Sequence, residues 1–391
     1  MGQLIEPDEV EGLALIICAV LGVLHGAKVD LCPAGEHPHM AGGVVLRRGK
    51  SPLVVGHALV HQITELGVGL AQDEPPIVGD VHLPLANDCE ITLEGRIHHF
   101  EEAKMEAALA GGVNRFSLGV QTFNTQVRQS VQRVDGRDAL ISRLEKLCSY
   151  DNAAVVIDLI YGFPGQTMEV WEDDLATAMT LPLDGVDCYQ LNVFEKSPLA
   201  KYIANGKLPA AADTAQKANM FAKSVEVLTA HQWHRLSNNH WRQTNRERNI
   251  YNELGKSACD CLAFGCGSGG RLKGYGFMMN RSLADWSAGV DAGLKPVMVM
   301  TAPGPNWALL RTVSSDMESG AINLPCISER FGVDVDALTR EVTSQWEEAG
   351  LVTRTGDWLV QTVAGQFWHV TLAQLLVDLI GKALRKEALA A

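Results

Sequence analysis

The sequence has no long apolar run. Its longest, Leu13 to Leu24, has twelve residues and is followed at once by His25 and Lys28, whereas a helix needs about 20 apolar residues to cross a bilayer. The acidic residues before this run are also unlike a secretory signal. We therefore expect no membrane span and no export.

An excess of basic charge is also missing. The chain has 33 Lys and Arg against 46 Asp and Glu, a formal net charge of −13. Phosphate binding depends on clustered basic side chains, so nucleic acid is excluded as the expected partner. The nine cysteines are scattered without a framework of paired spacings in a chain far larger than a disulfide scaffold. A reducing cytoplasm is the expected location.

From about residue 83 the sequence alternates between short β-branched runs and amphipathic stretches, which predicts a parallel sheet built from βα units. The 391 residues, 47% of them hydrophobic, are enough for one large domain and a smaller one. The expected strands are 89–94, 114–120, 154–160 and 186–192. The expected helices are 99–110, 138–150 and 169–180.

The C-terminal part has a different pattern. Helical stretches 335–349 and 371–386 flank two short strand candidates, 351–353 and 358–361. This order predicts a small α+β, winged-helix-like domain over 301–391, after a barrel core with its extension over 83–300. With 7 basic and 11 acidic residues, residues 301–391 do not look like a DNA reader. Residues 1–82 follow no sustained hydrophobic period.

Alternation along the strands separates two faces, because successive side chains of a strand point to opposite sides. Apolar residues such as Leu93, Phe116 and Ile157 are expected to face the helices. The opposite, lumen-facing set is polar: Glu90, Thr92, Glu94, Arg115, Ser117, Gly119, Gln121, Asp158, Cys188, Gln190 and Asn192. These side chains either satisfy one another as a buried network or bind a polar small molecule. Carboxylates, amides and an arginine suit a nucleoside-like ligand such as S-adenosylmethionine (SAM).

Several blocks of sequence then allow a family to be named. The segments EITLEGRIHHF, GVNRFSLGVQTFN, VVIDLIYGFPGQT, SNNHWRQTNRERNIYN and CLAFGCGSGGRLKGYG closely resemble the radical SAM haem-utilisation proteins of the HutW/ChuW type. That group is related to the oxygen-independent coproporphyrinogen III dehydrogenases and to the haem chaperone-like HemW proteins. The resemblance covers residues 83–391. It implies an α/β fold with a partial radical-SAM-type (β/α) barrel, incomplete at its N-terminus.

The resemblance also implies cofactors and the residues that contact SAM. The cofactors are SAM and a [4Fe-4S] cluster. The implied SAM contacts are Glu94, Gln121, Arg133, Asp158 and Asn192, with a glycine-rich turn at Gly265, Gly267 and Gly269. Arg133 rests on the motif match alone, because by itself it is a typical solvated helix-end residue.

The reaction implied by the resemblance is reductive cleavage of SAM, followed by methylation and opening of haem to a linear tetrapyrrole with release of iron. A flavodoxin- or ferredoxin-like electron donor is implied for an intact enzyme. Imidazoles can approach iron and arginines can pair with propionates. The candidate haem contacts are His98, His99, His240, Trp241, Arg242, Arg246 and Arg248. No particular catalytic residue can be assigned.

The cluster-binding motif of the family is absent from the sequence. Family members hold the cluster with a C-x-x-x-C-x-x-C run, whose three thiolates leave the fourth iron open to SAM. Here Cys18 and Cys32 are fourteen residues apart, and a GGGTP-type loop is missing too. The cysteines Cys259, Cys261 and Cys266 are expected to be small packing residues. No metal ligands are identifiable, and we expect this polypeptide to perform no radical chemistry.

Three interpretations remain open. The first is a haem-opening enzyme whose residues 1–82 reflect a frameshift, a mis-called start or a fused fragment rather than evolved loss. The second is a cluster-free haem-binding or trafficking protein, or a catalytically dead remnant, that keeps the pocket. The third is an enzyme like the oxygen-independent coproporphyrinogen III oxidases. This interpretation is weaker, because the segment HWRQTNRERN resembles the haem-opening group more closely.

Overall fold

The computed structural model describes residues 88–390, apart from His99 and residues 257–258, together with five short strands in the first 87 residues. Expectations that concern the rest of residues 1–82, including Cys18 and Cys32, lie outside the described residues, as does the candidate His99. No helix in these described ranges is both long enough and apolar enough to span a bilayer.

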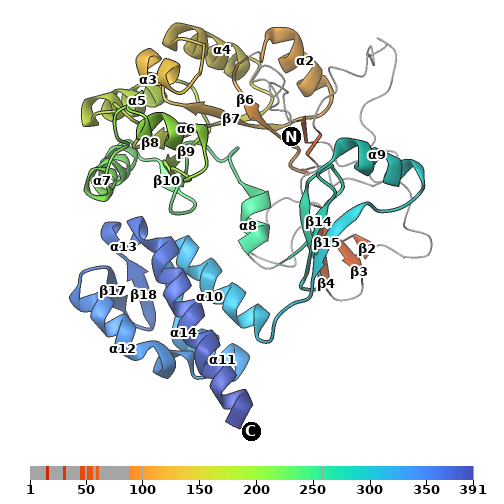
Figure 1. Ribbon diagram of the computed structural model, residues 1–391, viewed down its shortest axis with the longest axis vertical. Helices are drawn as coiled ribbons and strands as arrows, with labels where there is room; N and C mark the ends of the chain where they lie inside the picture. The colour runs from red at the N-terminus through yellow and green to blue at the C-terminus, as the bar shows by residue number, and fades with distance from the viewer. Residues whose placement is uncertain are drawn as a thin grey trace.

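A six-stranded sheet, here called the main sheet, forms the centre of the fold, in the order β10-β11-β9-β8-β7-β6 (Figure 1). Strands β6 to β9 are parallel, whereas β11 and β10 run antiparallel to their neighbours. The strands are β6 Thr92–Arg96, β7 Arg115–Gln121, β8 Ala154–Tyr161, β9 Gly185–Gln190, β10 His234–Arg235 and β11 His240–Arg242. All four parallel strands expected from the sequence are confirmed, and within the described residues the sheet is an open partial barrel.

Helices cover one face of the main sheet. The helices that supply buried residues to the core on this face are α2 Glu102–Ala110, α4 Arg137–Ser149, α5 Met168–Thr180 and α7 Thr214–Ala230. Two short helices, α3 Thr125–Ser130 and α6 Pro198–Ala204, follow β7 and β9. Leu93, Phe116 and Ile157 point toward this helical layer and are fully buried there, as their alternation predicted. Burying an apolar side chain of this size contributes about 1.5–3 kcal/mol. The opposite face of the main sheet is the lumen face.

A second sheet was not predicted. It has the order β15-β14-β13-β12-β4-β3-β2 and joins segments from both ends of the barrel region. Its strands are β2 Asp30–Leu31, β3 Val45–Arg48, β4 Ser51–Val55, β12 Asp260–Leu262, β13 Gly269–Leu272, β14 Tyr275–Met279 and β15 Val297–Thr301. Asp260 of β12 pairs in parallel with Leu53 of β4. Helix α8 Ile250–Lys256 precedes β12, α9 Leu283–Asp291 connects β14 to β15, and β1 Leu15–Ile16 pairs separately with β5 Leu59–Val60.

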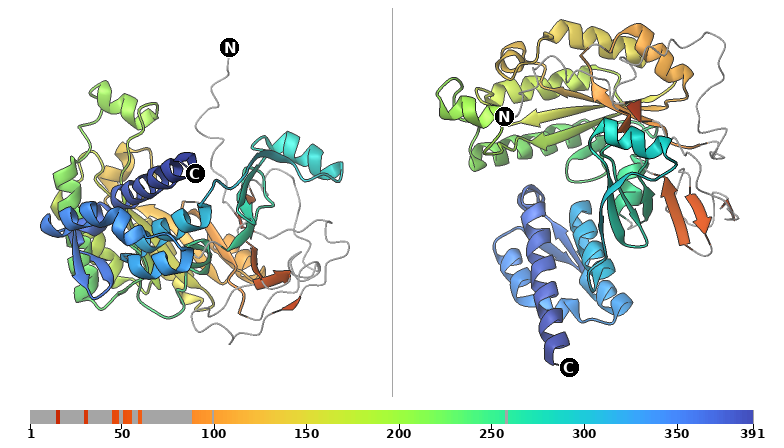
Figure 2. Two further views of the ribbon diagram at one scale, coloured as in Figure 1. Left: turned by 90° about the horizontal axis from the view of Figure 1, so that it is seen from below. Right: turned by 45° about the vertical axis from the view of Figure 1, so that its right-hand side comes forward.

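The C-terminal elements form a separate unit, drawn in blue beside the main sheet (Figure 2). They are α10 Trp307–Ser319, β16 Ala321–Asn323, α11 Leu324–Phe331, α12 Val335–Glu348, β17 Val352–Thr355, β18 Trp358–Gln361, α13 Val363–Phe367 and α14 His369–Ala390. This winged-helix-like unit has its own core around Val313, Ile322 and Leu376. The rings of Phe221 and Phe367, 5.9 Å apart, join it to the helices of the barrel.

Candidate functional site

The pairing of the parallel strands aligns polar residues on the lumen face. Arg96, Gly119, Asp158 and Asp187 occupy one row across β6 to β9. Burial, together with the negative charges of Asp187 and Glu94, raises the pKa of Asp158 to about 7. This row therefore concentrates carboxylates, which can accept hydrogen bonds from hydroxyls or attract a cation.

Glu94 faces the same lumen from β6. Its side chain is exposed to solvent at the surface of the lumen. The loss of hydration on the protein side raises the Glu94 pKa, Arg115 lowers it, and the negative charge of Asp187 raises it further, so that the net shift is upward. Glu94 and Asp158 act on each other electrostatically. The two predicted SAM-site carboxylates are therefore neighbours in the fold.

Gln121 and Arg133 converge on Gly119, at the end of β7. The Arg133 Nη1 group donates a hydrogen bond to the Gly119 carbonyl at 3.2 Å. Burial lowers the pKa of Arg133 to about 10, assisted by Arg96 and Arg128 and opposed by Asp158. Gln121 has a φ of 73°, and its Oε1 atom is buried with no hydrogen-bond partner among the described residues. A buried acceptor without a partner is costly, which makes this amide available to a ligand.

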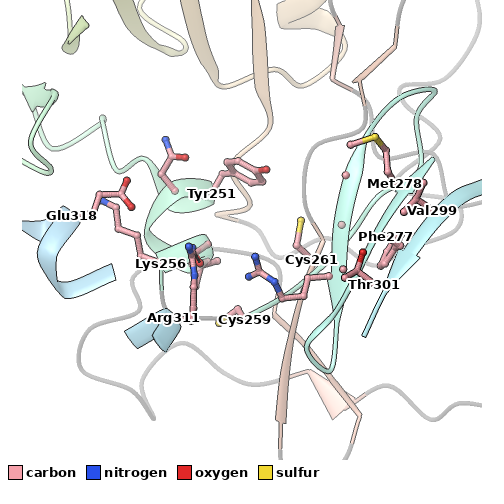
Figure 3. Close-up of a pocket in the computed structure, with 17 residues that line it drawn as sticks. Tyr251, Lys256, Cys259, Cys261, Phe277, Met278, Val299, Thr301, Arg311 and Glu318 are labelled. Carbon is pink, nitrogen blue, oxygen red and sulfur yellow. Dashed lines mark hydrogen bonds between the residues drawn. The ribbon is translucent and has the colours of Figure 1, made fainter. Parts of the chain in front are cut away.

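The other predicted SAM residues lie elsewhere. Asn192 is exposed, two residues after β9 ends. Gly265 and Gly267 precede β13 in the second sheet, with a φ of 72° at Gly267. Gly269 lines a cavity of about 620 Å³ (Figure 3). Glu94, Gln121, Arg133 and Asp158 are thus brought together, whereas the glycine turn leads into β13 of the second sheet.

A buried network lies beneath the lumen face. Arg115 forms a two-pronged ion pair with Glu247, and His240 lies between Glu247 and Asp187. His240 Nδ1 is 2.7 Å from Asp187 Oδ2, and Nε2 is 3.1 Å from Glu247 Oε1. Although burial opposes it, these two carboxylates raise the pKa of His240 to about 9. His240 was predicted to contact haem. Instead, both of its ring nitrogens are engaged inside the protein.

The remaining haem candidates also have structural partners. Trp241 is buried in the core on the helical side, so it points away from the lumen. Arg246 Nε pairs with Asp184 Oδ1 at 3.0 Å, beside the first residue of β9. Sites in (β/α) barrels lie at the opposite, carboxyl ends of the strands. Trp241 therefore packs in the core and Arg246 is paired at the other end of the strands, while their predicted haem contacts stay a prediction.

His98, Arg242 and Arg248 lie apart from one another. His98 Nδ1 is 2.8 Å from Asp135 Oδ2. Arg248 donates to the Asp88 carbonyl at 2.9 Å. Arg242 is on β11, and its Nε atom is buried without a partner among the described residues. The structure therefore does not gather the predicted haem residues into one site.

Sequence reasoning assigned the faces of β9 incorrectly. Cys188, predicted to face the lumen, is buried in the core with the helices, because Asp187 lies opposite Asp158 on the lumen side. The signal was present, since a charged residue is more costly to bury among helices than a cysteine. Tyr189 shares the lumen side, and burial and Asp187 raise its pKa. Glu247 had no comparable signal, because it is distant from its partners in sequence.

A cluster-binding site does not fit the described residues. Within residues 88–390, with the gaps given above, no group of three or more His, Cys, Asp or Glu side chains is placed to hold a metal ion. Cys266 Sγ is 3.2 Å from the Asn280 carbonyl, and Cys259 and Cys261 line the cavity. The residues on the lumen face, in contrast, offer acceptors and arginines suited to SAM, Arg133 among them.

Several known proteins are similar to this chain. No protein-family model matches the chain. An anaerobilin synthase of Escherichia coli O157:H7 is 38% identical over 299 residues, which cover 76% of this chain and 66% of that protein. An oxygen-independent coproporphyrinogen III oxidase of Helicobacter pylori is 25% identical over 316 residues, covering 74% and 68%. The chain thus spans about two thirds of the length of these relatives.

The solved structure of coproporphyrinogen III oxidase (HemN) from Escherichia coli, described as a radical SAM enzyme, superimposes with a TM-score of 0.62 at 18% identity. The superposition covers 74% of this chain and 70% of the HemN chain. The fold is thus that of the radical SAM class. Within that class, the chain belongs to the family of haem-related radical SAM enzymes that contains the anaerobilin synthases and is related to the oxygen-independent coproporphyrinogen III oxidases. SAM and a [4Fe-4S] cluster are the cofactors of this family.

Proposed function

We propose that this chain carries the SAM-binding and tetrapyrrole-binding parts of an anaerobic haem-opening enzyme of the anaerobilin synthase type. The observation that carries the proposal is the gathering of Glu94, Asp158, Gln121 and Arg133 on the lumen face, with a buried Gln121 acceptor that has no partner in the described residues. The 38% identity to an anaerobilin synthase, against 25% to a coproporphyrinogen oxidase, favours haem opening as the family reaction.

The lumen residues suit the separate parts of SAM. The Glu94 and Asp158 carboxylates accept hydrogen bonds from ribose hydroxyls and favour the positive sulfonium. The Gln121 amide accepts from an amino group, and Arg133 pairs with a carboxylate. When bound, SAM supplies a methyl group and an adenosyl group for the family chemistry. The protein groups bind and orient it.

The second part of the proposal concerns activity. The sequence has no C-x-x-x-C-x-x-C run, so the polypeptide as given is expected to bind SAM without cleaving it. A flavodoxin- or ferredoxin-like donor is the proposed partner only of a chain that has the missing ligands. Haem or a related tetrapyrrole is the proposed substrate. A cluster-free haem-binding role remains the alternative, and it does not need the SAM contacts.

Equilibrium dialysis with radiolabelled SAM tests the binding part. We expect Glu94→Gln to weaken SAM binding about tenfold, since a hydrogen bond to a charged group contributes about 1.5–3 kcal/mol. The control is Glu341→Gln, because Glu341 is exposed on α12. Equal SAM affinity of the wild type and Glu94→Gln would refute the proposed SAM site. Haem binding without any SAM binding would favour the cluster-free alternative.

Formation of 5′-deoxyadenosine tests the activity part. The chain is incubated anaerobically with iron, sulfide, a reductant and SAM, and the products are measured by chromatography. We expect none above the level of a protein-free control. Catalytic turnover by this polypeptide would show that it holds a cluster through ligands other than the missing run.

A further inference from the structure

The cavity beside the second sheet has two chemically different walls (Figure 3). Lys256 of α8 and Arg311 and Glu318 of α10 lie on one side. Phe277 and Met278 of β14 lie on the other. At about 620 Å³, the cavity is within the range of about 300–1,000 Å³ typical of small-molecule sites. Such walls suit a molecule with an apolar body and anionic groups along one edge.

Cations outnumber carboxylates around the cavity. Arg271, Arg311 and Lys256 line the cavity with one carboxylate, Glu318. Lys256 is already paired with Glu253, Nζ to Oε1 at 3.0 Å. Arg271 stacks on the Trp307 ring at 5.3 Å, and no carboxylate in the described part of the chain forms an ion pair with it. Arg271 is therefore a positive group held in place by packing.

Arg311 has unused hydrogen-bonding capacity. Its Nη2 atom donates to the Gly255 carbonyl at 2.6 Å, but its Nε atom is buried without a partner within the described ranges. Burial and the nearby positive charge of Arg271 lower the pKa of Arg311. Two guanidinium groups that repel each other across a cavity are stabilised together when an anion binds between them.

The cavity also adjoins the lumen face. Tyr251 of α8 lines the cavity, and Glu94 of β6 is among the charges that raise the Tyr251 pKa, after burial and Cys261. Tyr251, which lines the cavity, is therefore within electrostatic range of the predicted SAM carboxylate Glu94.

We propose that Arg271 and Arg311 bind the carboxylate side chains of the tetrapyrrole, and that Phe277 and Met278 cover its apolar ring. This inference rests on the proposed function for the identity of the ligand, and it places the carboxylate contacts away from HWRQTNRER. The arginines orient the ligand by forked hydrogen bonds to its carboxylates. They act in binding and positioning.

Porphyrin titration of the full chain tests this site. Protoporphyrin IX and its dimethyl ester, at the same low detergent concentration, are followed by the absorbance shift on binding. We expect the free acid to bind more tightly than the ester. Arg271→Gln should weaken binding of the acid roughly tenfold and leave binding of the ester unchanged. Only the acid has carboxylates that accept charge-assisted hydrogen bonds from Arg271, so only the acid loses them in the variant. Arg340→Gln is the matched control, since Arg340 is exposed on α12 and pairs with Asp336.

Arg311→Gln is expected to act like Arg271→Gln, but it also removes the bond to the Gly255 carbonyl. Arg311→Lys keeps the charge and should retain part of the affinity if Arg311→Gln fails to fold. Equal binding of acid and ester, or no effect of Arg271→Gln, would overturn the inference. So would complete displacement of protoporphyrin by excess inorganic phosphate, which indicates a general anion site.

SAM dialysis on the same variants separates this inference from the proposed function. Carboxylate-dependent porphyrin binding with no SAM binding would refute the SAM part of that function and leave the cavity assignment standing. Normal SAM binding with no effect of Arg271→Gln on porphyrin would refute the cavity assignment alone.

Discussion

Glu247 binds Arg115 through two hydrogen bonds, at 2.9 Å and 3.1 Å, although the two residues are 132 positions apart in the sequence. Both side chains are buried, and they tie the start of β7 to the segment that follows β11. The same carboxylate contacts His240, which joins the pair to Asp187 of β9. The network therefore fixes the position of Asp187, which is one of the carboxylates on the lumen face.

Removing one charge of this buried pair is expected to be costly. Glu247→Gln leaves Arg115 without its counterion, and breaking a buried ion pair costs about 3–5 kcal/mol. Guanidinium unfolding followed by tryptophan fluorescence measures the change. Asp336→Asn is the control, because Asp336 pairs with Arg340 at the surface, where a pair contributes about 0–1 kcal/mol. Equal losses in the two variants would contradict the assigned role of the network.

The protonation of His240 gives the network a pH dependence. Its pKa is raised from 6.5 to about 9 in the folded chain. A raised pKa means that the stabilisation is fully present below about pH 6.5 and is lost as the pH rises through about 9. We expect wild type to lose at most about 3 kcal/mol over this window. His240→Asn should show a flatter profile between pH 6.5 and 9.5 in the same unfolding experiment. A wild-type profile as flat as that of the variant would argue against a charged His240.

Gly119 is expected to control the position of the Gln121 amide. A Cβ atom at Gly119 would lie 2.6 Å from Gln121 Nε2, the far end of a flexible side chain. Gly119→Ala should therefore displace the amide at little cost in stability, yet weaken SAM binding roughly tenfold through a lost hydrogen bond. Gly304→Ala is the control, since a Cβ there meets nothing within 4 Å. Unchanged SAM affinity in Gly119→Ala would separate Gln121 from the SAM site.

The parts of the fold that follow a local period could be predicted from the sequence. Strand β8 is apolar except for Asp158 and the terminal Tyr161, so its one charged side chain marked the lumen face, and Asp158 was placed there correctly. Strand β9 has only six residues with polar and small side chains on both faces, and its phase was assigned wrongly at Cys188. A short strand with weak contrast does not determine its own register, because its neighbours do.

Features built from distant segments could not be predicted. Strand β4 pairs with β12, whose residues are about 200 positions later, and neither strand is long enough to show a period. The cavity takes Arg271 from β13 and Arg311 from α10. Arg246 resembled a ligand arginine by composition, but only the fold places it against Asp184. In each case the role of a residue or strand depends on a segment that is distant in the sequence, so the local sequence does not reveal it.

The pKa of Asp158 leads to a last prediction, about SAM binding. Burial and the carboxylates of Asp187 and Glu94 raise this pKa to about 7. The ionised carboxylate is the better acceptor for ribose hydroxyls, and it favours the positive sulfonium. SAM affinity is therefore expected to rise as the pH increases through about 7, with release of a proton on binding. Calorimetric titration between pH 6 and 8, in two buffers of different ionisation enthalpy, measures both effects.

Asp158→Asn separates this proton from others in the site. The amide cannot ionise, so the variant should bind SAM weakly and with the same affinity on both sides of pH 7. Glu94→Gln should keep a pH dependence, but with a lower midpoint, because it removes one of the negative charges that raise the Asp158 pKa. A midpoint that does not move in Glu94→Gln would show that the charge of Glu94 does not raise the Asp158 pKa. In that case burial and Asp187 alone would account for the raised pKa.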